Sequence, residues 1–265
     1  MGYQLTKAAA VGLVCVLVAG CAAELVNESS LTPENQRLMQ LAGDVEARGD
    51  YHTASALYAR AAQASDNAVE AHLRLGNAQL KTGDFAGASA AFTKVLQSDP
   101  KHPDALLGLG TAQLKSGDAE SSARTLAVAA PLVATSGAYN RLGTALIMLG
   151  RLDPAREAFE RAQSLAPNDL DITVNVALAQ ALAGRTDEAV TAMRAVTESP
   201  LAQPRHRANL VMVLGIAGRF DEAKAVSVPN MSDAQKRDLL ARAKKVRDAP
   251  DPLAKARAIG LLTAA

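Results

Sequence analysis

The side chains best suited to covalent chemistry are two cysteine thiols near the start of the chain. Cys15 and Cys21 are the only cysteines, and both lie within the first 21 of the 265 residues. The rest of the chain therefore has no internal disulfide and no thiolate metal site. A thiol is a nucleophile that can be acylated, so attachment of lipid is the chemistry that these residues could support.

Cys21 follows a segment that is typical of a signal peptide. Lys7 supplies a positive charge, residues 8–18 form an unbroken apolar run, and small residues come next. The run is too short to span a membrane, because a spanning helix needs about 20 apolar residues. The sequence therefore predicts a signal peptide over residues 1–20.

The residues Val18-Ala19-Gly20-Cys21 resemble the lipobox of bacterial lipoproteins, in which an aliphatic residue and two small residues precede an obligatory Cys. The resemblance implies that the Cys21 thiol carries a diacylglycerol and that residues 21–34 form a lipidated tether. Ala22 replaces the Asp that usually marks inner-membrane retention, so the resemblance favours the periplasmic face of the outer membrane. The alternative is an ordinary secretory signal in which Cys21 is incidental.

The remaining chemically active residues form no recognisable catalytic or metal site. None of the four histidines has a partner at metal-ligand spacing: His52, His72, His102 and His206. Asp and Glu recur at predicted helix starts, where they complement the helix dipole. The chain has neither a phosphate-binding loop with Lys-Ser/Thr nor a Gly-x-Ser-x-Gly elbow. We therefore expect a protein that is not an enzyme and uses no cofactor or metal.

Six glycines at a nearly fixed spacing define the elements that would position a binding surface. They are 34, 34, 33, 34 and 34 residues apart: Gly49, Gly83, Gly117, Gly150, Gly184 and Gly218. The flanking sequence recurs too, since residues 75–84 read LGNAQLKTGD and residues 109–118 read LGTAQLKSGD. A fixed period of this length indicates stacked supersecondary units.

The repeat resembles the tetratricopeptide (TPR) family, whose 34-residue unit is a helix-turn-helix. With the shared Gly as position 15, small residues recur at positions 8 and 20, where two helices cross closely, and large residues at position 24, which fills the space between units. Position 8 holds Ala42, Gly76, Gly110, Gly143, Ala177 and, as a departure, Val211; position 20 holds Ala54, Ala88, Ser122, Ala155, Ala189 and Ala223; position 24 holds Tyr58, Phe92, Leu126, Phe159 and Met193. The resemblance implies an all-α, right-handed solenoid of about six repeats over residues 35–228, the last one incomplete.

The ends of the helices carry signals of their own. The shared Gly can adopt a positive φ and end the first helix of each unit. Asp153-Pro154 predicts an N-cap followed by Pro at the first position of the second helix, and Asp187 and Asp221 hold the same place in their units.

The repeat pattern breaks at Val228-Pro229, and a different segment follows. Ser232 predicts the N-cap of a helix that runs to about Arg247, with apolar residues on one side. A solenoid needs a terminal cap with a polar outer face, and this segment suits that role. Residues 229–265 are therefore predicted to form a capping helix and a basic tail, with eight Lys or Arg against four Asp.

In TPR proteins the first helix of each unit lines the binding groove, so the resemblance also implies a set of groove residues. They are Leu73, Asn77 and Leu80; Leu107, Thr111 and Leu114; Asn140, Arg141, Thr144 and Ile147; Val174, Asn175 and Leu178; and Asn209 and Met212. Leu80, Leu114 and Ile147 would form an apolar stripe for an amphipathic or hydrophobic peptide. Asn175 and Asn209 would hold a peptide backbone through their amides. The alternative is that the stripe packs against a neighbouring helix and the Asn side chains cap helices or face water.

A lipobox followed by TPR units resembles the TPR lipoproteins of envelope machines. Residues 139–143 and 207–210 look like the assembly lipoproteins of tight-adherence (Flp) pili, the TadD-like group. That resemblance implies a scaffold that assists assembly or localisation of the pilus apparatus, as a pilotin-like partner of the secretin. The alternatives are a general periplasmic scaffold for polysaccharide export or outer-membrane protein assembly, and an accessory module of a cell-wall enzyme. The net charge of +1 argues against nucleic acid as a partner, and no small-molecule substrate is expected.

Overall fold

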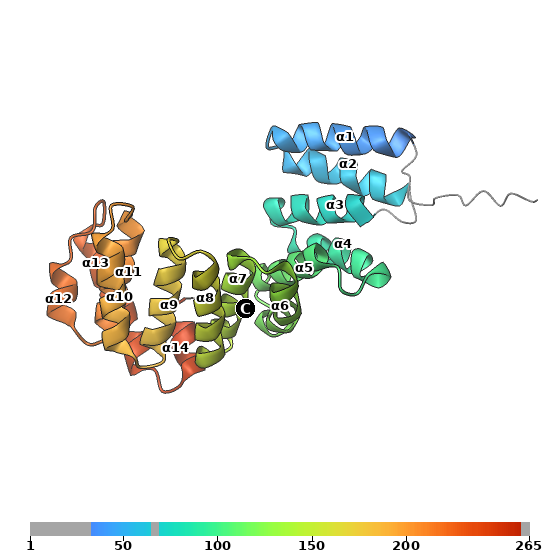
Figure 1. Cartoon of the computed structure of the whole chain (residues 1–265). Coiled ribbons are helices and arrows are strands. Elements are labelled where there is room, and N and C mark those ends of the chain that lie inside the picture. Colours follow the sequence, from blue (N-terminus) through green and yellow to red (C-terminus); the bar gives the residue numbers. More distant parts are fainter. Residues whose placement is uncertain (1–32, 65–68, 261–265) are drawn as a thin grey trace, which may run out of the picture. The chain divides into compact units, whose positions relative to one another are not determined.

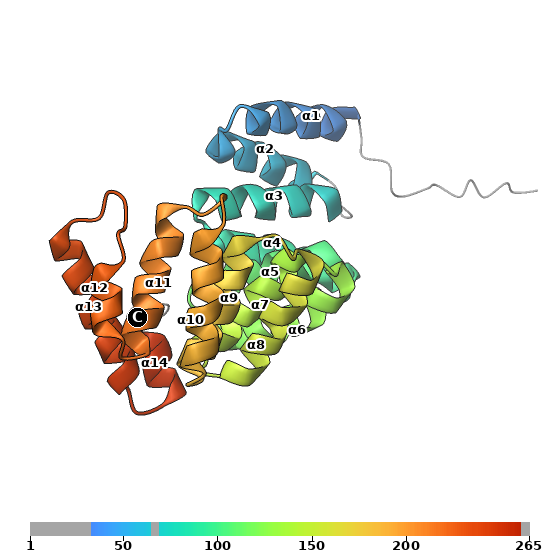
Figure 2. The ribbon, with the colours of Figure 1, turned by 60° about the vertical axis from the view of Figure 1, so that its left-hand side comes forward.

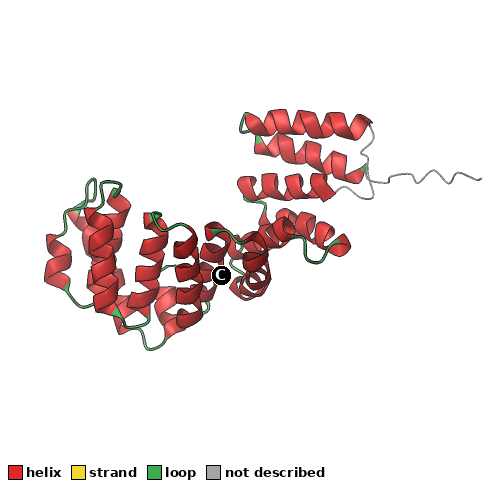
Figure 3. Ribbon diagram, in the orientation of Figure 1, coloured by secondary structure: helices red, strands yellow, loops and turns green. Residues whose placement is uncertain are grey.

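The computed structural model describes residues 33–64 and 69–260, and within those ranges every regular element is an α-helix (Figures 1 and 3). Cys21 and the predicted signal peptide lie outside the described residues. The helices are α1 (Pro33–Ala47), α2 (Tyr51–Gln63), α3 (Val69–Thr82), α4 (Phe85–Ser98), α5 (Pro103–Lys115), α6 (Ala119–Val133), α7 (Ser136–Met148), α8 (Leu152–Leu165), α9 (Leu170–Leu182), α10 (Thr186–Glu198), α11 (Pro204–Ile216), α12 (Phe220–Ala225), α13 (Asp233–Asp248) and α14 (Pro252–Ala258). None of them combines the length and the apolar character needed to cross a bilayer.

The helices pack in consecutive pairs, which confirms the predicted fold of helix-turn-helix repeats (Figure 2). We call the pairs units 1 to 6, from α1 and α2 to α11 and α12. The first helices of neighbouring units also meet, because α5 contacts both α3 and α7, and α9 contacts α11. We call the surface formed by α3, α5, α7, α9 and α11 the first-helix face.

Each of the six repeated glycines ends a first helix in the left-handed conformation. Their φ angles run from +70° at Gly150 to +88° at Gly117. A side chain at such a φ is strained, so glycine lets the chain reverse directly into the second helix. The predicted role of these glycines is confirmed.

Small residues allow the two helices of a unit to approach closely. A Cβ added at Gly143 would lie 2.5 Å from a ring carbon of Phe159, and one added at Gly110 would lie 2.6 Å from Leu126 Cγ. Ser122 is fully buried at the same crossing, where its hydroxyl donates a hydrogen bond to the Gly110 carbonyl over 2.8 Å. The crossing therefore needs small residues at positions 8 and 20 and a large one at position 24, as predicted.

The predicted N-cap at Asp153 is wrong. Helix α8 begins at Leu152, so its N-cap is Arg151, whose side chain makes no capping hydrogen bond. Asp153 instead accepts a hydrogen bond from Arg185 of the next unit over 3.3 Å. The same shift applies to the other two predicted caps: α10 and α12 have Arg185 and Arg219 at the N-cap, and Asp187 pairs with Arg219.

The C-terminal segment closes the last unit. Helix α12 is short, and Ser232 begins α13 with a capping box in which Ser232 and Gln235 bond each other's backbone N–H groups, which confirms the predicted N-cap. Ala243 and Val246 of α13 are fully buried. They belong to a continuous apolar cluster that extends from Ile147 to Ala256, whereas the other clusters are each confined to neighbouring helices of units 1 to 4.

Candidate functional site

The first-helix face of units 2 to 4 contains a cavity of about 340 Å³, which we call the N-terminal cavity. Helices α3, α5 and α7 supply all of its lining. Six of the predicted groove residues line it: Leu73, Asn77, Leu80, Leu107, Thr111 and Arg141. Four further lining residues were not predicted: Glu70, Arg74, Asp104 and Gly108. The structure therefore brings the predicted residues of units 2 and 3 together with Arg141 of unit 4.

The N-terminal cavity combines an apolar base with a charged rim. Leu73 is buried and Leu80 is half-buried against the same core, while Leu107 is half-buried against the cluster around Leu126. At the rim, the Arg74 guanidinium lies 2.7 Å from the Glu70 carboxylate, and Arg141 donates a hydrogen bond to the Gly137 carbonyl over 3.0 Å. Because both charge signs and apolar surface are present, the cavity suits a peptide segment better than a compact ion.

A second cavity of about 260 Å³ lies in units 4 to 6, and we call it the C-terminal cavity. Six other predicted groove residues line it: Thr144, Ile147, Asn175, Leu178, Asn209 and Met212. Helices α8 and α9 add Phe159, Ala179 and Leu182. The remaining three lining residues come from the C-terminal segment: Leu239, Arg242 and Ile259. This cavity is therefore bounded partly by the chain's own C-terminal segment.

Family models of the tetratricopeptide repeat match residues 136–169, and residues 173–195 with 204–227. A model described as the middle TPR-like domain of cilia and flagella-associated protein 70 matches residues 38–141. The chain is a TPR-repeat protein. TPR repeats are scaffolds for protein–protein interaction. No curated protein sequence matches this TPR protein.

Solved structures with similar folds include other TPR proteins. A crystal structure of MamA protein superposes with a TM-score of 0.52 and 23% identity, over 66% of this chain and 91% of that one. A MamA AMB-1 structure gives a TM-score of 0.53 and 25% identity, over 61% and 88%. The thermophilic TPR protein TTC0263 of Thermus thermophilus gives a TM-score of 0.51 and 21% identity, over 68% and 98%. These likenesses show the fold of the TPR units.

The apolar stripe expected across the TPR groove is not one open strip. Leu80 lines the N-terminal cavity, but Leu114 packs against the cluster around Leu126. Ile147 is only 3% exposed, because it lies in the large C-terminal cluster. Val174 is likewise 3% exposed. A sequence register places these residues on one face but does not show that other segments cover part of that face.

Asn175 and Asn209, which were both predicted to bind a peptide backbone, differ in their hydrogen bonding. Asn175 and Asn209 both line the C-terminal cavity, but the Asn175 amide donates a hydrogen bond to Asn140 Oδ1 over 2.8 Å. Asn140, which lines neither cavity, therefore links α7 to α9. The Asn175 amide, which was predicted to bind a peptide, is therefore already hydrogen-bonded to a residue of unit 4.

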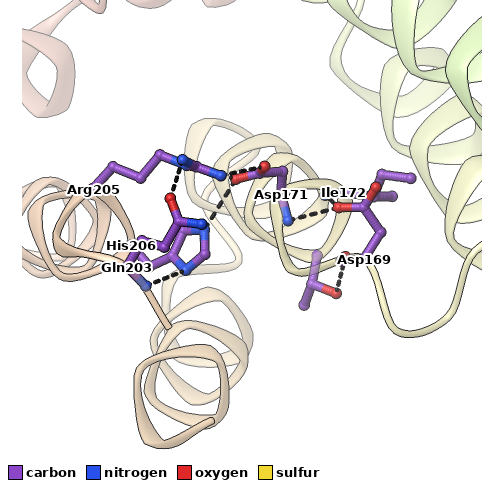
Figure 4. Close-up of polar contacts among 7 residues, drawn as sticks. Asp169, Asp171, Ile172, Gln203, Arg205 and His206 are labelled. Carbon is purple, nitrogen blue, oxygen red and sulfur yellow. Dashed lines mark hydrogen bonds and ion pairs between the residues drawn. The ribbon is translucent and has the colours of Figure 1, made fainter. Parts of the chain in front are cut away.

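A polar cluster between units 5 and 6 was missed at the sequence level (Figure 4). Asp171 accepts hydrogen bonds from Arg205 over 2.7 Å and from His206 Nε2 over 3.0 Å. His206 Nδ1 accepts from the Gln203 backbone N–H over 3.1 Å, so the ring is neutral with its proton on Nε2 when both bonds form. The hydrogen bond from Arg205, followed by that from His206, lowers the pKa of Asp171. The only sequence signal was the spacing of Asp171 and Arg205, which is one repeat length.

Two other histidines lie in units 2 and 3, outside both cavities. His102 is the N-cap of α5, where its Nδ1 accepts from the Ala105 N–H over 3.4 Å. Burial, followed by the nearby charge of Lys94, lowers the pKa of His72. Within residues 33–64 and 69–260, no group of His, Asp and Glu has the geometry to hold a metal ion.

Proposed function

We propose that this TPR protein is a lipid-anchored scaffold at the periplasmic face of the outer membrane, where it assists assembly or localisation of a tight-adherence (Flp) pilus apparatus. In this proposal Cys21 carries the lipid and the TPR units bind a segment of a client protein. The secretin of the apparatus is the proposed client. Lipid attachment would keep the scaffold at the membrane and raise the local concentration of the client.

The N-terminal cavity is the observation that carries the binding part of this proposal. It is lined by three consecutive first helices, and its apolar base and its rim of paired and unpaired charges match what a peptide segment presents. Asn77 is exposed beside this base, so its amide is available to a peptide backbone. The pilus assignment is supported by the sequence resemblance to the TadD-like group.

Affinity capture from detergent-solubilised envelopes, with proteins identified by mass spectrometry, tests the proposal. Leu107→Glu places a charge on the half-buried base of the N-terminal cavity. Val128→Glu makes the same chemical change at a side chain that is 48% exposed on α6 and outside the cavity. We expect wild type and Val128→Glu to recover secretin or other pilus components, and Leu107→Glu to lose them.

The other outcomes are equally informative. Recovery of polysaccharide-export, outer-membrane-assembly or cell-wall proteins in place of pilus components would reject the pilus assignment and keep the scaffold. Equal recovery of pilus components by all three proteins would reject the N-terminal cavity as the client site.

The lipid anchor is tested separately by metabolic labelling with palmitate. We expect wild type and Cys15→Ser to be labelled, and Cys21→Ser to be unlabelled and released from the membrane fraction. Label on Cys21→Ser, or its absence from wild type, would reject the anchor. Separation of inner and outer membranes on a density gradient then tests the proposed location.

A further inference from the structure

Helix α14 lies on the first-helix face of the later units. After α13, the chain turns at residues 249–251 and begins α14 with Asp251, whose carboxylate accepts from the Ala254 N–H over 2.8 Å. Helix α14 contacts both α7 and α9, which are the first helices of units 4 and 5 (Figure 1). This surface is the one on which a TPR unit would present its groove, and here the chain's own segment covers it.

Helix α14 packs on α13, and three of its residues anchor it further, each at a position that selects a kind of side chain. The Lys255 ammonium donates to the Leu182 carbonyl over 3.1 Å, at the C-terminal end of α9, where the helix dipole favours a cation. Ala256 is fully buried, so its position accepts only a small residue. Ile259 supplies apolar surface to the C-terminal cavity beside Leu178 and Met212.

The start of α14 also packs closely against unit 4. A Cβ added at Gly150 would lie 2.7 Å from the Leu253 backbone nitrogen, so the turn of unit 4 touches the α14 backbone directly. The Leu253 side chain is 37% exposed and is therefore not a major anchor. A helix that occupies this place therefore needs a capped start, a Lys, a small residue directly after the Lys and an aliphatic residue four positions after it.

We propose that α14 with Ile259 is a displaceable internal ligand, and that the C-terminal cavity binds a client helix of the same pattern, Asp-Pro-x-x-Lys-Ala-x-x-Ile. A helix of this length is not stable in water by itself, so its structure depends on the surface beneath it. Its side chains anchor it through one charged contact, one small residue and one aliphatic residue, so a client segment with the same side chains can replace it. The inference rests on the proposed client-binding function and adds what the second cavity recognises.

The test uses a fluorescent peptide with the sequence of residues 249–260 and measures its binding to the purified full-length protein by anisotropy. Lys255→Glu and Ala256→Asp disrupt the internal ligand and leave the cavity residues of α7, α9 and α11 unchanged. Lys245→Glu makes the same charge change on an exposed side chain of α13 and is the control. If α14 is docked in nine of ten wild-type molecules, its release should tighten peptide binding about tenfold.

We expect both disrupted variants to bind the peptide about tenfold more tightly than wild type and Lys245→Glu do. A peptide with Glu in place of its Lys should not bind. Circular dichroism and the unfolding midpoint show whether each variant is folded, and Lys255→Glu, at a half-buried site, is the variant expected to remain so.

No binding by folded variants, or equally tight binding by wild type, would overturn the proposal. Hydrogen exchange gives a second measurement on the wild type alone: excess peptide should leave α9 protected while the amides of α14 become less protected. Unchanged protection of α14 with the peptide bound would also overturn it. Neither failure affects the capture experiment, which depends on the N-terminal cavity and on the identity of the client.

Discussion

At the scale of single residues, the close crossing inside unit 4 is sensitive to side-chain size. We expect Gly143→Ala to lower the free energy of unfolding by about 1–3 kcal/mol, because the added methyl group overlaps the Phe159 ring and the core must shift. Gly137→Ala is a matched control in the same helix, since its Cβ would meet only the flexible end of Arg141, at 3.1 Å. The control should stay within about 0.5 kcal/mol of wild type. Urea unfolding of both variants measures the difference, and equal effects would contradict the packing argument.

The cluster around Asp171 predicts a dependence of stability on pH. The folded pKa of Asp171 is lowered, so its contribution is present above the ordinary carboxyl pKa and is lost as the pH falls through the folded value. Since the Asp171 side chain is 55% exposed, we expect Asp171→Asn to cost at most about 1 kcal/mol at pH 7. The difference in the free energy of unfolding between wild type and variant should shrink as the pH falls below about 4.

Urea titrations at several pH values measure that gap. Asp221→Asn is the control, because Asp221 pairs only with Lys224 of its own helix and its side chain is 99% exposed. A gap for Asp171→Asn that stays constant down to acid pH would show that the charge of Asp171 contributes nothing.

At the scale of helices, the starts of the second helices can be improved. Arg185 has φ −84° and ψ 62°, close to the values of Asp84, which caps α4 by accepting from the Gly87 N–H. We expect Arg185→Asn to gain about 1 kcal/mol from a new cap and to lose about 0.5 kcal/mol from the exposed pair with Asp153. The unfolding midpoint should therefore rise. Arg185→Ala, which loses the pair and adds no cap, should lower it.

The features that the sequence predicted are those that recur with the period of the repeat. The turn glycines, the small residues at helix crossings and the large residue between units face equivalent neighbours wherever they recur, so register alone places them. The errors have two causes. The N-cap of α8 was predicted two residues too late, at Asp153, because the helix start was judged from residue preference when the turn after Gly150 had already set it at Arg151. The burial of Ile147 was not predicted, because its cluster includes residues of the C-terminal segment, which lies outside the repeat and follows no period.

At the scale of the whole molecule, stability should be unequal along the array. A continuous apolar cluster joins units 4 to 6 to α13 and α14, whereas the clusters of units 1 to 3 are separate and small. In a repeat protein each unit depends on its neighbours, so the units with the smaller clusters should open first. We expect hydrogen exchange to show faster exchange in α1 to α4 than in α9 to α11. Uniform protection would contradict this and indicate a single cooperative unit.

The hydrogen bond from Lys255 to Leu182 also has a consequence for how the chain folds. Side-chain bonds between neighbouring units join residues 10 to 35 positions apart, from Gln163 with Thr173 to Asn140 with Asn175. The Lys255 bond spans 73 positions. Local contacts form quickly and distant ones must wait for the chain between them, so α14 can dock only after units 5 and 6 have been made and ordered. During synthesis, the C-terminal cavity would therefore exist open for a time before its own helix emerges to fill it.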